Sequence, residues 1–338
     1  MTTSSSTMRA AVLDAAGQPF RIAELGRPVP AQGQVLVRIH ASGVNPLDTK
    51  IRAGQAAHAQ QPLPSVLGMD LAGVVEAVGP GVTKFRRGDE VYGMAGGIGG
   101  LQGTLAEYVA VDADLIAFKP HNLSMREAAG IPLVFITAWE GLVDRANTQA
   151  GQTVLVHGGA GGVGHMAVQL ARSLGAKVFA TGGPSQAETI RRFGATPIDY
   201  TTASVDDYVA QHTAGEGFDV VYDTVGGAVL DASFVAARRY GGHVVSCLGW
   251  GTHGLAPLSF RAATYSGVFT LLPMITGRGR AHHGEILDAA TRLAEAGQLV
   301  PLMDARRFSL SQATSAHEAV EAVEAGNARG RVVVDIAA

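Results

Sequence analysis

The sequence contains a single cysteine, Cys247, in 338 residues. One thiol excludes an intramolecular disulfide framework and a zinc site built on several cysteines, and it suits a reducing cytosol. Charged residues are also sparse, at 16%, and the formal net charge is −3. We therefore expect no basic field that would collect nucleic acid or an anionic membrane.

Long apolar runs are missing as well. No stretch reaches the roughly 18 residues that span a bilayer. The first eight residues, MTTSSSTM, lack the basic start and the apolar segment of a signal peptide. We accordingly expect a cytoplasmic protein with no membrane partner. The hydrophobic content of 47% is ordinary for a folded chain, and 338 residues suggest two domains.

Glycine is in excess, at 44 residues, and it falls in clusters between short Val-rich runs. Runs bounded by Gly and Pro predict strands at 8–13, 34–40, 71–78, 90–92 and 107–111. Strands at this spacing are typical of a small, partly open β-barrel. Ser124 and Glu127 then have the spacing of a helix capping box, and a helical apolar period continues to Val143.

From Gly151 onward strands and helices alternate. Apolar strands are expected at 153–157, 177–180, 197–199, 220–223 and 243–247, and helices at 162–174, 186–193 and 205–212. This alternation predicts a parallel, doubly wound sheet with right-handed crossovers. Helices at 284–296 and 312–325 and a strand at 303–308 precede a last strand, 331–336, which we expect to return to the first domain.

Gly159-Ala-Gly-Gly-Val-Gly164 matches G-x-G-x-x-G between an apolar strand and an amphipathic helix. Glycines at this spacing allow a tight turn and close approach of the backbone to a pyrophosphate, and N–H groups at the helix start attract phosphate. We expect a dinucleotide at Gly159, Gly161, Gly162, Val163 and Gly164. A Gly-rich turn without a ligand is the alternative. A kinase-type phosphate loop is excluded because no Gly-Lys-Ser/Thr follows.

The end of the next strand indicates which dinucleotide binds. Where NAD sites carry an acidic residue, this chain reads Thr181-Gly182-Gly183-Pro184-Ser185, so no carboxylate there repels a 2′-phosphate. Ser185 with Arg191 or Arg192 is suited to bind that phosphate, which favours NADPH over NADH. We expect Thr181, Gly182, Ser185 and Arg192 to be among the cofactor contacts. A solvated helix face is the alternative role for the two arginines.

Several motifs follow one another along nearly the whole chain: Ala41-Ser-Gly-Val-Asn-Pro-Leu-Asp48, Gly68-Met-Asp-Leu-Ala-Gly-Val-Val75, Phe85-Arg-Arg-Gly-Asp-Glu-Val-Tyr92, Ala106-Glu-Tyr-Val109, Ile136-Thr-Ala138, the glycine loop and Ala328-Arg-Gly-Arg-Val-Val333. Together they resemble the medium-chain dehydrogenase/reductase superfamily, specifically its zinc-independent quinone oxidoreductase branch. The resemblance implies an α/β fold. A mostly β, GroES-like barrel catalytic domain, residues 1–128 and 279–338, is interrupted by a Rossmann NADP-binding domain with a doubly wound parallel sheet, residues 129–278.

The resemblance also bears on metal binding. Zinc-dependent relatives carry a cysteine ligand at the position of Asn45 and a histidine ligand at that of Met69. An amide and a thioether do not replace them, because a catalytic zinc takes about three ligands of the Cys, His or carboxylate kind. The histidines show no H-x-x-x-H or H-E-x-x-H spacing, and the pair at 282–283 reads as a solvated turn. We expect no metal site.

Two catalytic residues follow from the same resemblance. Asn45 is implied near the nicotinamide, with capping of the turn before Pro46 as its alternative role. Lys50 stands where many relatives have tyrosine and some enone-reducing relatives have lysine. We expect Lys50 to donate a hydrogen bond to the substrate oxygen as negative charge develops there. A surface lysine on a short helix is the alternative.

Further cofactor contacts are implied by resemblance. Tyr200 matches a family tyrosine at the adenosine end, and Thr137 is expected at the pyrophosphate and the nicotinamide ribose. Ala187 stands where relatives often carry a basic residue for the 2′-phosphate, a departure from the NADP pattern. The residues implied around the nicotinamide are Ser246, Leu248, Gly249, Leu271 and Asn327.

Together these residues predict hydride transfer from NADPH to a quinone or an α,β-unsaturated ketone, followed by protonation. The alternatives are an enoyl-thioester reductase and a dinucleotide-binding protein with little catalysis. Relatives commonly pair through an edge strand of the Rossmann sheet. We therefore expect a homodimer that forms through residues 243–247 or 267–272.

Overall fold

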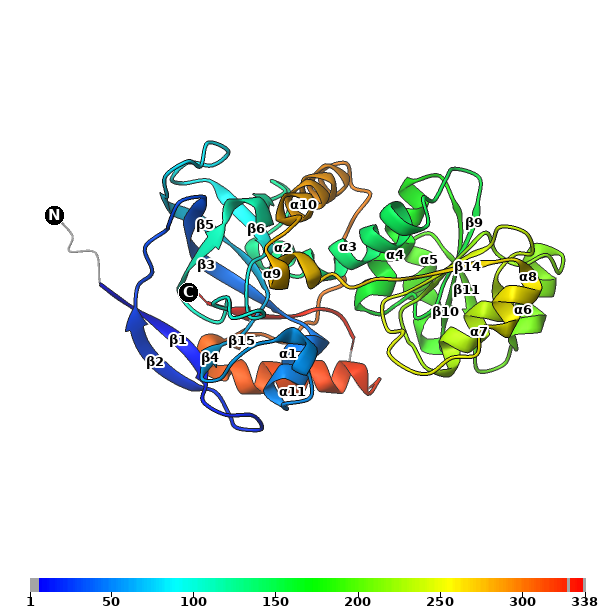
Figure 1. Cartoon of the computed structure of the whole chain (residues 1–338), viewed down its shortest axis with the longest axis horizontal. Coiled ribbons are helices and arrows are strands. Elements are labelled where there is room, and N and C mark those ends of the chain that lie inside the picture. The colour runs from blue at the N-terminus through cyan, green and yellow to red at the C-terminus, as the bar shows by residue number, and fades with distance from the viewer. Residues whose placement is uncertain (1–5, 327–328, 337–338) are drawn as a thin grey trace. The chain divides into compact units, whose positions relative to one another are not determined.

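The computed structural model describes residues 6–326 and 329–336. The chain divides into two compact units, one of Met1–Leu133 with Leu271–Ala338 and the other of Val134–Thr270. The first unit therefore contains both ends of the chain, and the second is one continuous stretch (Figure 1). The boundaries between the two units fall at 133/134 and 270/271. The sequence predicted domain boundaries at 128/129 and 278/279.

The first unit is mostly β and contains two sheets. A three-stranded sheet has the order β2-β1-β4, and a seven-stranded sheet has the order β15-β16-β3-β5-β6-β8 with β7 paired to β3. The bounds are β1 Thr7–Leu13, β2 Arg21–Gly26, β3 Gln34–Val44, β4 Ser65–Val66, β5 Asp70–Val78, β6 Glu90–Met94, β7 Tyr108–Asp112, β8 Ile116–Phe118, β15 Phe308–Ser309 and β16 Val332–Asp335. The Gly- and Pro-bounded runs therefore predicted β1, β3, β5, β6 and β7, but not β2, β4 or β8.

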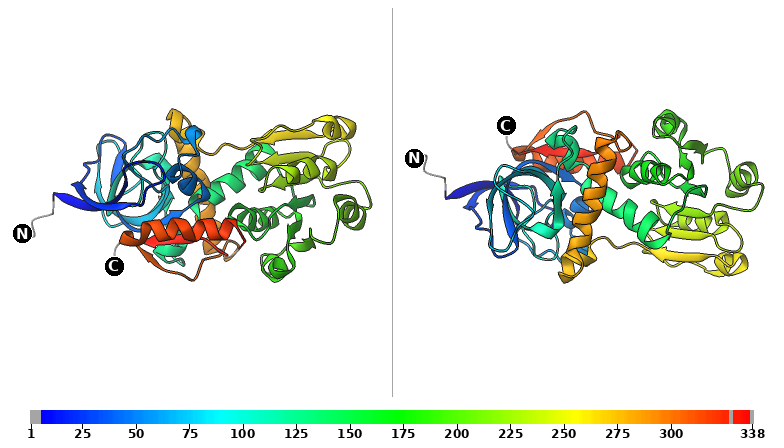
Figure 2. Two further views of the ribbon diagram at one scale, coloured as in Figure 1. Left: turned by 90° about the horizontal axis from the view of Figure 1, so that it is seen from below. Right: turned by 90° about the horizontal axis from the view of Figure 1, so that it is seen from above.

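The last strand returns to the first unit, as expected. β16 pairs antiparallel with β3, in a register that places Val332 opposite Val44 and Asp335 opposite Ala41. Figure 2 shows two long helices, α10 in orange and α11 in red, against this β-rich body. The helices of the unit are α1 Pro46–Arg52, α2 Met125–Ala129, α9 Leu272–Thr276, α10 Arg280–Glu295 and α11 Ala313–Glu324.

The helix expected from Ser124 to Val143 is interrupted. Ser124 and Glu127 form the predicted capping box at the start of α2, but α2 ends at Ala129 and a second helix, α3 (Pro132–Trp139), follows. From Glu140 to Arg145 the helix widens into a π-helical turn. The side chain of Tyr222 accounts for this widening.

The tyrosine side chain of Tyr222 enters this helix. Its hydroxyl donates to the Thr137 carbonyl, which an α-helix would pair with the N–H of residue 141. Gly141 allows the ring to approach, because a Cβ at this position would lie 2.6 Å from the Tyr222 Cζ. An inserted side chain of this kind is a known cause of π-turns and kinks.

The second unit contains one six-stranded parallel sheet in the order β11-β10-β9-β12-β13-β14. Its strands are β9 Thr153–Val156, β10 Lys177–Gly182, β11 Thr196–Asp199, β12 Val220–Asp223, β13 His243–Ser246 and β14 Thr264–Gly267. Its main helices are α4 Gly162–Ser173, α5 Ala187–Arg192, α6 Val205–Thr213, α7 Ala228–Ala236 and α8 Ala256–Arg261. This is the doubly wound Rossmann order, whose direction reverses between β9 and β12.

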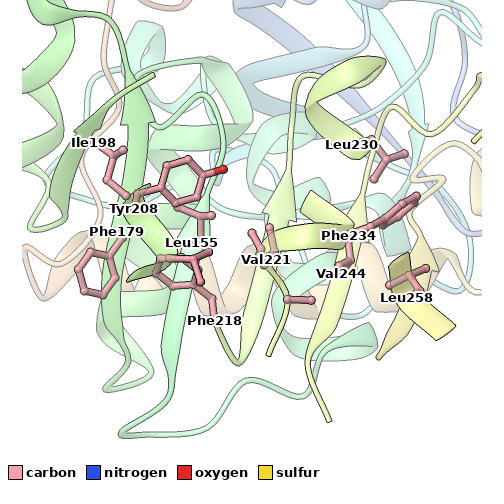
Figure 3. Packing of buried hydrophobic residues seen from close by; sticks show 13 residues of the cluster. Leu155, Phe179, Ile198, Tyr208, Phe218, Val221, Leu230, Phe234, Val244 and Leu258 are labelled. Atoms are coloured by element: carbon pink, nitrogen blue, oxygen red, sulfur yellow. The ribbon is translucent and has the colours of Figure 1, made fainter. Parts of the chain in front are cut away.

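A core of buried side chains joins this sheet to the helices α6, α7 and α8 (Figure 3). Leu155, Phe179 and Val221 come from neighbouring strands, and Tyr208 and Phe234 from two of the helices. Each such side chain contributes roughly 1.5–3 kcal/mol when buried. The core therefore holds the carboxyl ends of the strands in fixed positions.

Within residues 6–326 and 329–336, the structure settles which strand forms the sheet edge and whether a helix is able to span a membrane. β13 lies between β12 and β14, so the expectation that 243–247 forms the edge strand is wrong, and β14 occupies that edge. None of the helices combines the length and the apolar composition that a bilayer crossing requires.

Candidate functional site

The candidate site residues fall into two sets, one in each unit. In the second unit, the glycine loop follows β9 and leads into α4 at the point where the strand order reverses. A parallel sheet binds ligands outside its carboxyl ends at such a point. Gly162, Val163 and Gly164 form the first turn of α4, where the first N–H groups of a helix have no intrahelical acceptor.

The glycines of the loop differ in the space around them. A Cβ at Gly159 would lie 2.4 Å from the Ala180 Cβ, and one at Gly164 would lie 2.0 Å from the Gly158 oxygen. At Gly161 the nearest atom is the same Gly158 oxygen, at 3.1 Å, and φ is −76°. Gly159 and Gly164 are therefore required by the fold, whereas Gly161 keeps space in front of the α4 N-terminus open. This is the fit that a pyrophosphate requires.

Side chains at the neighbouring strand ends support the loops. The Thr181 hydroxyl accepts from the Gly158 N–H and contacts His157 Nδ1 at 3.2 Å. Burial lowers the pKa of His157 to about 4, against the opposing charge of Asp223, so this imidazole is neutral at pH 7. The Thr181 hydroxyl is thus bonded to the loop, and its contact with the cofactor stays a prediction.

Asp223, at the end of β12, organises the adjacent loops. It is fully buried and accepts hydrogen bonds from the N–H groups of Val225 and Gly226. The Ser246 hydroxyl donates to Asp223 and accepts from the Leu248 N–H. Ser246 and Leu248, both predicted near the nicotinamide, therefore lie in one hydrogen-bonded turn beside the switch point.

Gly249 and Thr137 complete the set in the second unit. A Cβ at Gly249 would lie 2.2 Å from the Tyr265 hydroxyl, so a larger residue there would have to displace the end of this tyrosine side chain. The Thr137 hydroxyl lies 3.2 Å from that of Thr270, which donates to Glu140. Thr137 is thus held at both its hydroxyl and its carbonyl.

The residues predicted for the adenosine end lie at the end of β10, in the turn that follows it and just after β11. Gly182 pairs in register with Asp199, which precedes Tyr200, and Tyr200 is 62% exposed. Ser185 follows in the 3-10 turn that leads into α5. Arg192 lies at the other end of α5, with its guanidinium over the Phe193 ring, and its contact with the 2′-phosphate stays a prediction.

The alternative cation, Arg191, is engaged locally. It forms an ion pair with Glu188 one turn earlier in α5. Of the two remaining predicted contacts, Leu271 is a buried residue of the first unit at the start of α9. Asn327 lies outside the described residues.

In the first unit, Asn45 belongs to a buried group of four residues that we call the Arg331 cluster: Asn45, Asp48, Asp70 and Arg331. All four are at most 4% exposed. Asn45 begins α1, and its amide Nδ2 donates to Asp70 at 3.0 Å while its Oδ1 accepts from the Arg331 guanidinium. Since a carboxylate only accepts and a guanidinium only donates, the orientation of this amide is fixed.

The two carboxyl groups of the Arg331 cluster have different partners. Asp70 accepts from Asn45 and from the Leu133 N–H, and it lies 3.5 Å from Arg331. Asp48 accepts from the Asn45 N–H at 2.8 Å, and the Gly68 N–H also acts on its carboxyl group. Burial raises the pKa of Asp48 to about 7 and the pKa of Asp70 to about 6, although Arg331 and the hydrogen bonds oppose both increases.

The arrangement restricts what Asn45 can do. Its carbonyl and one amide hydrogen are committed within the Arg331 cluster, which leaves one amide hydrogen to donate. Met69, at the other position where zinc-dependent relatives carry a ligand, is fully buried in the core. Within residues 6–326 and 329–336, no three His, Cys, Asp or Glu side chains gather as a metal site.

Lys50 lies one turn into α1. Its side chain is 45% exposed, and Nζ lies 3.7 Å from the Glu324 carboxylate on α11. A surface ion pair of this length is weak. Lys50 is therefore accessible to a ligand, but nothing in its immediate surroundings fixes it in place.

Sequence reasoning missed three of the four residues of the Arg331 cluster. Asp48, Asp70 and Arg331 all lie inside motifs quoted for the family resemblance, but no role was assigned to them. The available signal was a charged residue set among apolar ones: Asp70 between Met69 and Leu71, and Arg331 before three valines. Charges in such positions are rarely buried without partners.

Two family models match the chain. Residues 31–121 match the alcohol dehydrogenase GroES-like domain, and residues 193–334 match the zinc-binding dehydrogenase family. The crystal structure of an alcohol dehydrogenase superfamily protein from Novosphingobium aromaticivorans is 59% identical. It has a TM-score of 0.96 and covers 98% of this chain and 100% of its own.

Two curated relatives are similar over most of their length. The human quinone oxidoreductase is 30% identical over 99% of both chains. The chloroplastic NADPH-dependent alkenal/one oxidoreductase of Arabidopsis thaliana is 35% identical over 91% of this chain and 73% of its own. With the GroES-like unit, the Rossmann sheet and the glycine loop in place, the chain belongs to the medium-chain dehydrogenase/reductase superfamily, in its quinone oxidoreductase branch.

Proposed function

We propose that this protein is an NADPH-dependent oxidoreductase that reduces a quinone or an α,β-unsaturated ketone. The observation that carries the proposal is the open position at Gly161, in front of the α4 N-terminus and at the switch point of the sheet. The names of two relatives, an NADPH-dependent alkenal/one oxidoreductase and a quinone oxidoreductase, support the substrate class.

The cofactor-binding residues follow from the second unit. The first turn of α4 would hold the pyrophosphate, and the turn that contains Ser246 and Leu248 would present backbone groups to the nicotinamide. Ser185 and the exposed Tyr200 would hold the adenosine end. Preference for NADPH is supported by the absence of a carboxylate from the end of β10 and from the residues up to Ser185.

The bound cofactor supplies a hydride to the electrophilic carbon of the substrate. Lys50 would then stabilise the negative charge that develops on the substrate oxygen. Asn45, fixed by Asp70 and Arg331, would keep one amide hydrogen available as a second donor. We propose that this chemistry needs no zinc, because an amide already bonded to two partners and a buried thioether stand where zinc-dependent relatives have ligands.

We also propose a homodimer that forms through β14. This strand ends the sheet in the described part of the second unit. Large apolar side chains are exposed on it and around it: Tyr240, Trp250, Phe260 and Tyr265. An edge strand with apolar surroundings is suited to pair with a second copy.

Oxidation of NADPH should be observed with quinones or enones, and chelator should leave the rate unchanged. The screen should include simple alkenals, quinones, an enoyl thioester and a secondary alcohol with NADP⁺. Faster turnover of the enoyl thioester would instead identify the alternative reductase. Loss of activity with chelator, restored by zinc, would contradict the zinc-independent mechanism.

Replacing Gly161 with Val should abolish NADPH binding without unfolding the chain, because the side chain fills the open position while meeting only the Gly158 oxygen. Calorimetry measures the NADPH affinity, and circular dichroism the fold. Gly26→Val is the matched control, since a Cβ at Gly26 on β2 meets nothing within 4 Å. Wild-type NADPH affinity in Gly161→Val would show that the loop does not bind the cofactor.

Lys50→Met should lower kcat by about a hundredfold with little change in NADPH affinity, since removing one donor to an oxyanion typically costs about 2.7–4 kcal/mol. Lys84→Met is the control, because Lys84 is also a half-exposed lysine paired with a carboxylate, that of Asp288. Steady-state kinetics measures both variants. Equal kcat values in the two variants would make Lys50 a surface residue.

Light scattering should give the mass of two 34.8 kDa chains. Thr264→Lys should convert the dimer to monomers, since the exposed position lies on the edge strand and like charges would meet across a twofold axis. Val29→Lys, at an exposed apolar residue of the first unit, should leave the mass unchanged. An unaltered dimer in Thr264→Lys would place the interface elsewhere.

A further inference from the structure

The Arg331 cluster contains two buried carboxyl groups and one buried positive charge. Asp48 is 1% exposed, Asp70 is not exposed and Arg331 is 4% exposed. If both carboxyl groups were ionised, the cluster would carry a net negative charge away from water. A buried charge without compensation is strongly unfavourable, so one of the two groups must carry a proton.

Hydrogen bonding identifies the ionised group as Asp70. Its Oδ1 accepts from the Leu133 N–H at 3.0 Å, and its Oδ2 accepts from Asn45 Nδ2 at 3.0 Å. The Arg331 guanidinium lies 3.5 Å from the same Oδ2. Both oxygens therefore have donors, which is the environment that stabilises a carboxylate.

Asp48 is in a different environment. Its Oδ2 accepts from the Asn45 N–H at 2.8 Å. Its Oδ1 is buried and has no partner within hydrogen-bond geometry among the described residues, although the Gly68 N–H also acts on this carboxyl group and opposes the rise of its pKa. Asp70 and Arg331 are the charged groups that act on it. Arg331 is committed to Asp70, to the Asn45 carbonyl oxygen and to the Gly130 carbonyl.

The other charges of α1 are also engaged. Lys50 pairs with Glu324, and Arg52 pairs with Glu321 at 3.1 Å, so both cations of this helix face α11. Neither of these side chains is bonded to Asp48. The charge of an ionised Asp48 would thus have no cation of its own.

We propose that Asp48 is a positioning residue that the folded protein holds as the neutral carboxylic acid, and that the proton on its Oδ1 keeps the start of α1, with Asn45, in the arrangement needed for turnover. Ionisation would place a second anion next to Asp70. The first turn of α1 would then have to move or admit water, which displaces Asn45 and the following Lys50. The part of the proposal that concerns turnover rests on the proposed function, whereas the location of the proton does not.

The direction of the pH dependence follows from proton linkage. The pKa of Asp48 is raised by burial to about 7, well above the 3.8 that is usual for an unfolded chain. Between these values the folded state keeps a proton that the unfolded state has lost. The stability that Asp48 contributes therefore falls as the pH rises through this window, and stays at the lower level above it.

Asp48→Asn is the informative variant, because it is isosteric and neutral at every pH. Its amide oxygen can accept the Asn45 N–H, and its NH2 group takes the place of the unpartnered Oδ1. Asp70→Asn is the matched control. In Asp70→Asn the same change removes one of the two carboxylate oxygens that accept hydrogen bonds, together with the negative charge that balances Arg331.

Thermal unfolding at pH 5 and pH 8 tests where the proton lies. The midpoint of Asp48→Asn, measured relative to that of the wild type, should rise by about 2–4 °C or more between pH 5 and pH 8. Asp70→Asn should be less stable than the wild type at both pH values. A difference between Asp48→Asn and the wild type that does not change with pH, or a gain in stability from Asp70→Asn, would overturn the assignment.

Infrared spectroscopy of the wild type provides a second measurement that needs no variant. The band of a protonated carboxyl group should disappear as the pH rises through about 7. A spectrum without such a band at pH 6 would show that Asp48 is ionised and would overturn the proposal even if Asp48→Asn failed to fold.

The pH profile of kcat tests the positioning role. Wild-type kcat should fall as the pH rises past about 7, and Asp48→Asn should lose this decline while its NADPH affinity remains independent of pH over the same range. An unchanged decline in Asp48→Asn would overturn the positioning role. If no quinone or enone is turned over at all, the proposed function fails, while the unfolding and infrared results still decide where the proton lies.

Discussion

The buried positive charge of Arg331 connects distant segments of the first unit. A guanidinium taken out of water needs acceptors around its plane, and Arg331 finds them in the Gly130 carbonyl, the Asn45 amide oxygen and the Asp70 carboxylate. These groups come from segments far apart in the sequence. Because Asp70 also accepts from the Leu133 N–H, one charge links the start of α1, the start of α3 and the beginning of β16.

The second unit builds its site mainly from backbone. The side chains at the carboxyl ends of β9, β10, β12 and β13 are already bonded to loops of the protein: Thr181 to Gly158, and Ser246 to Asp223. Apart from Ser185 and Tyr200, proposed for the adenosine end, the described residues at this edge offer mainly a helix N-terminus and peptide groups. Such a site is suited to bind the phosphates and amides of a dinucleotide through its shape and its backbone groups. It supplies few reactive side chains, as is usual when a cofactor performs the reaction.

The sequence predicted most of the strands and the glycine loop because both depend on local spacing. β2 was missed because its residues are largely exposed and its sequence does not alternate clearly. α7 was missed because it is apolar on most sides. The π-helical turn after α3 was missed because it is shaped by Tyr222, which is distant in sequence, whereas the break before α3 coincides with Pro132. The sequence did not show that Ser185 and Arg192 stand at opposite ends of α5. The Arg331 cluster could not be predicted as a group, since its members meet only in three dimensions.

The contact between Gly141 and the Tyr222 ring couples the evolution of two distant positions. Any side chain at 141 needs the volume that the ring now occupies, because even a Cβ there would lie 2.6 Å from Cζ. A larger residue at 141 is therefore compatible only with a smaller one at 222, and losing the tyrosine also removes the hydroxyl that widens the helix. In diverging relatives these two positions should covary, with the π-helical turn gained or lost together with the tyrosine.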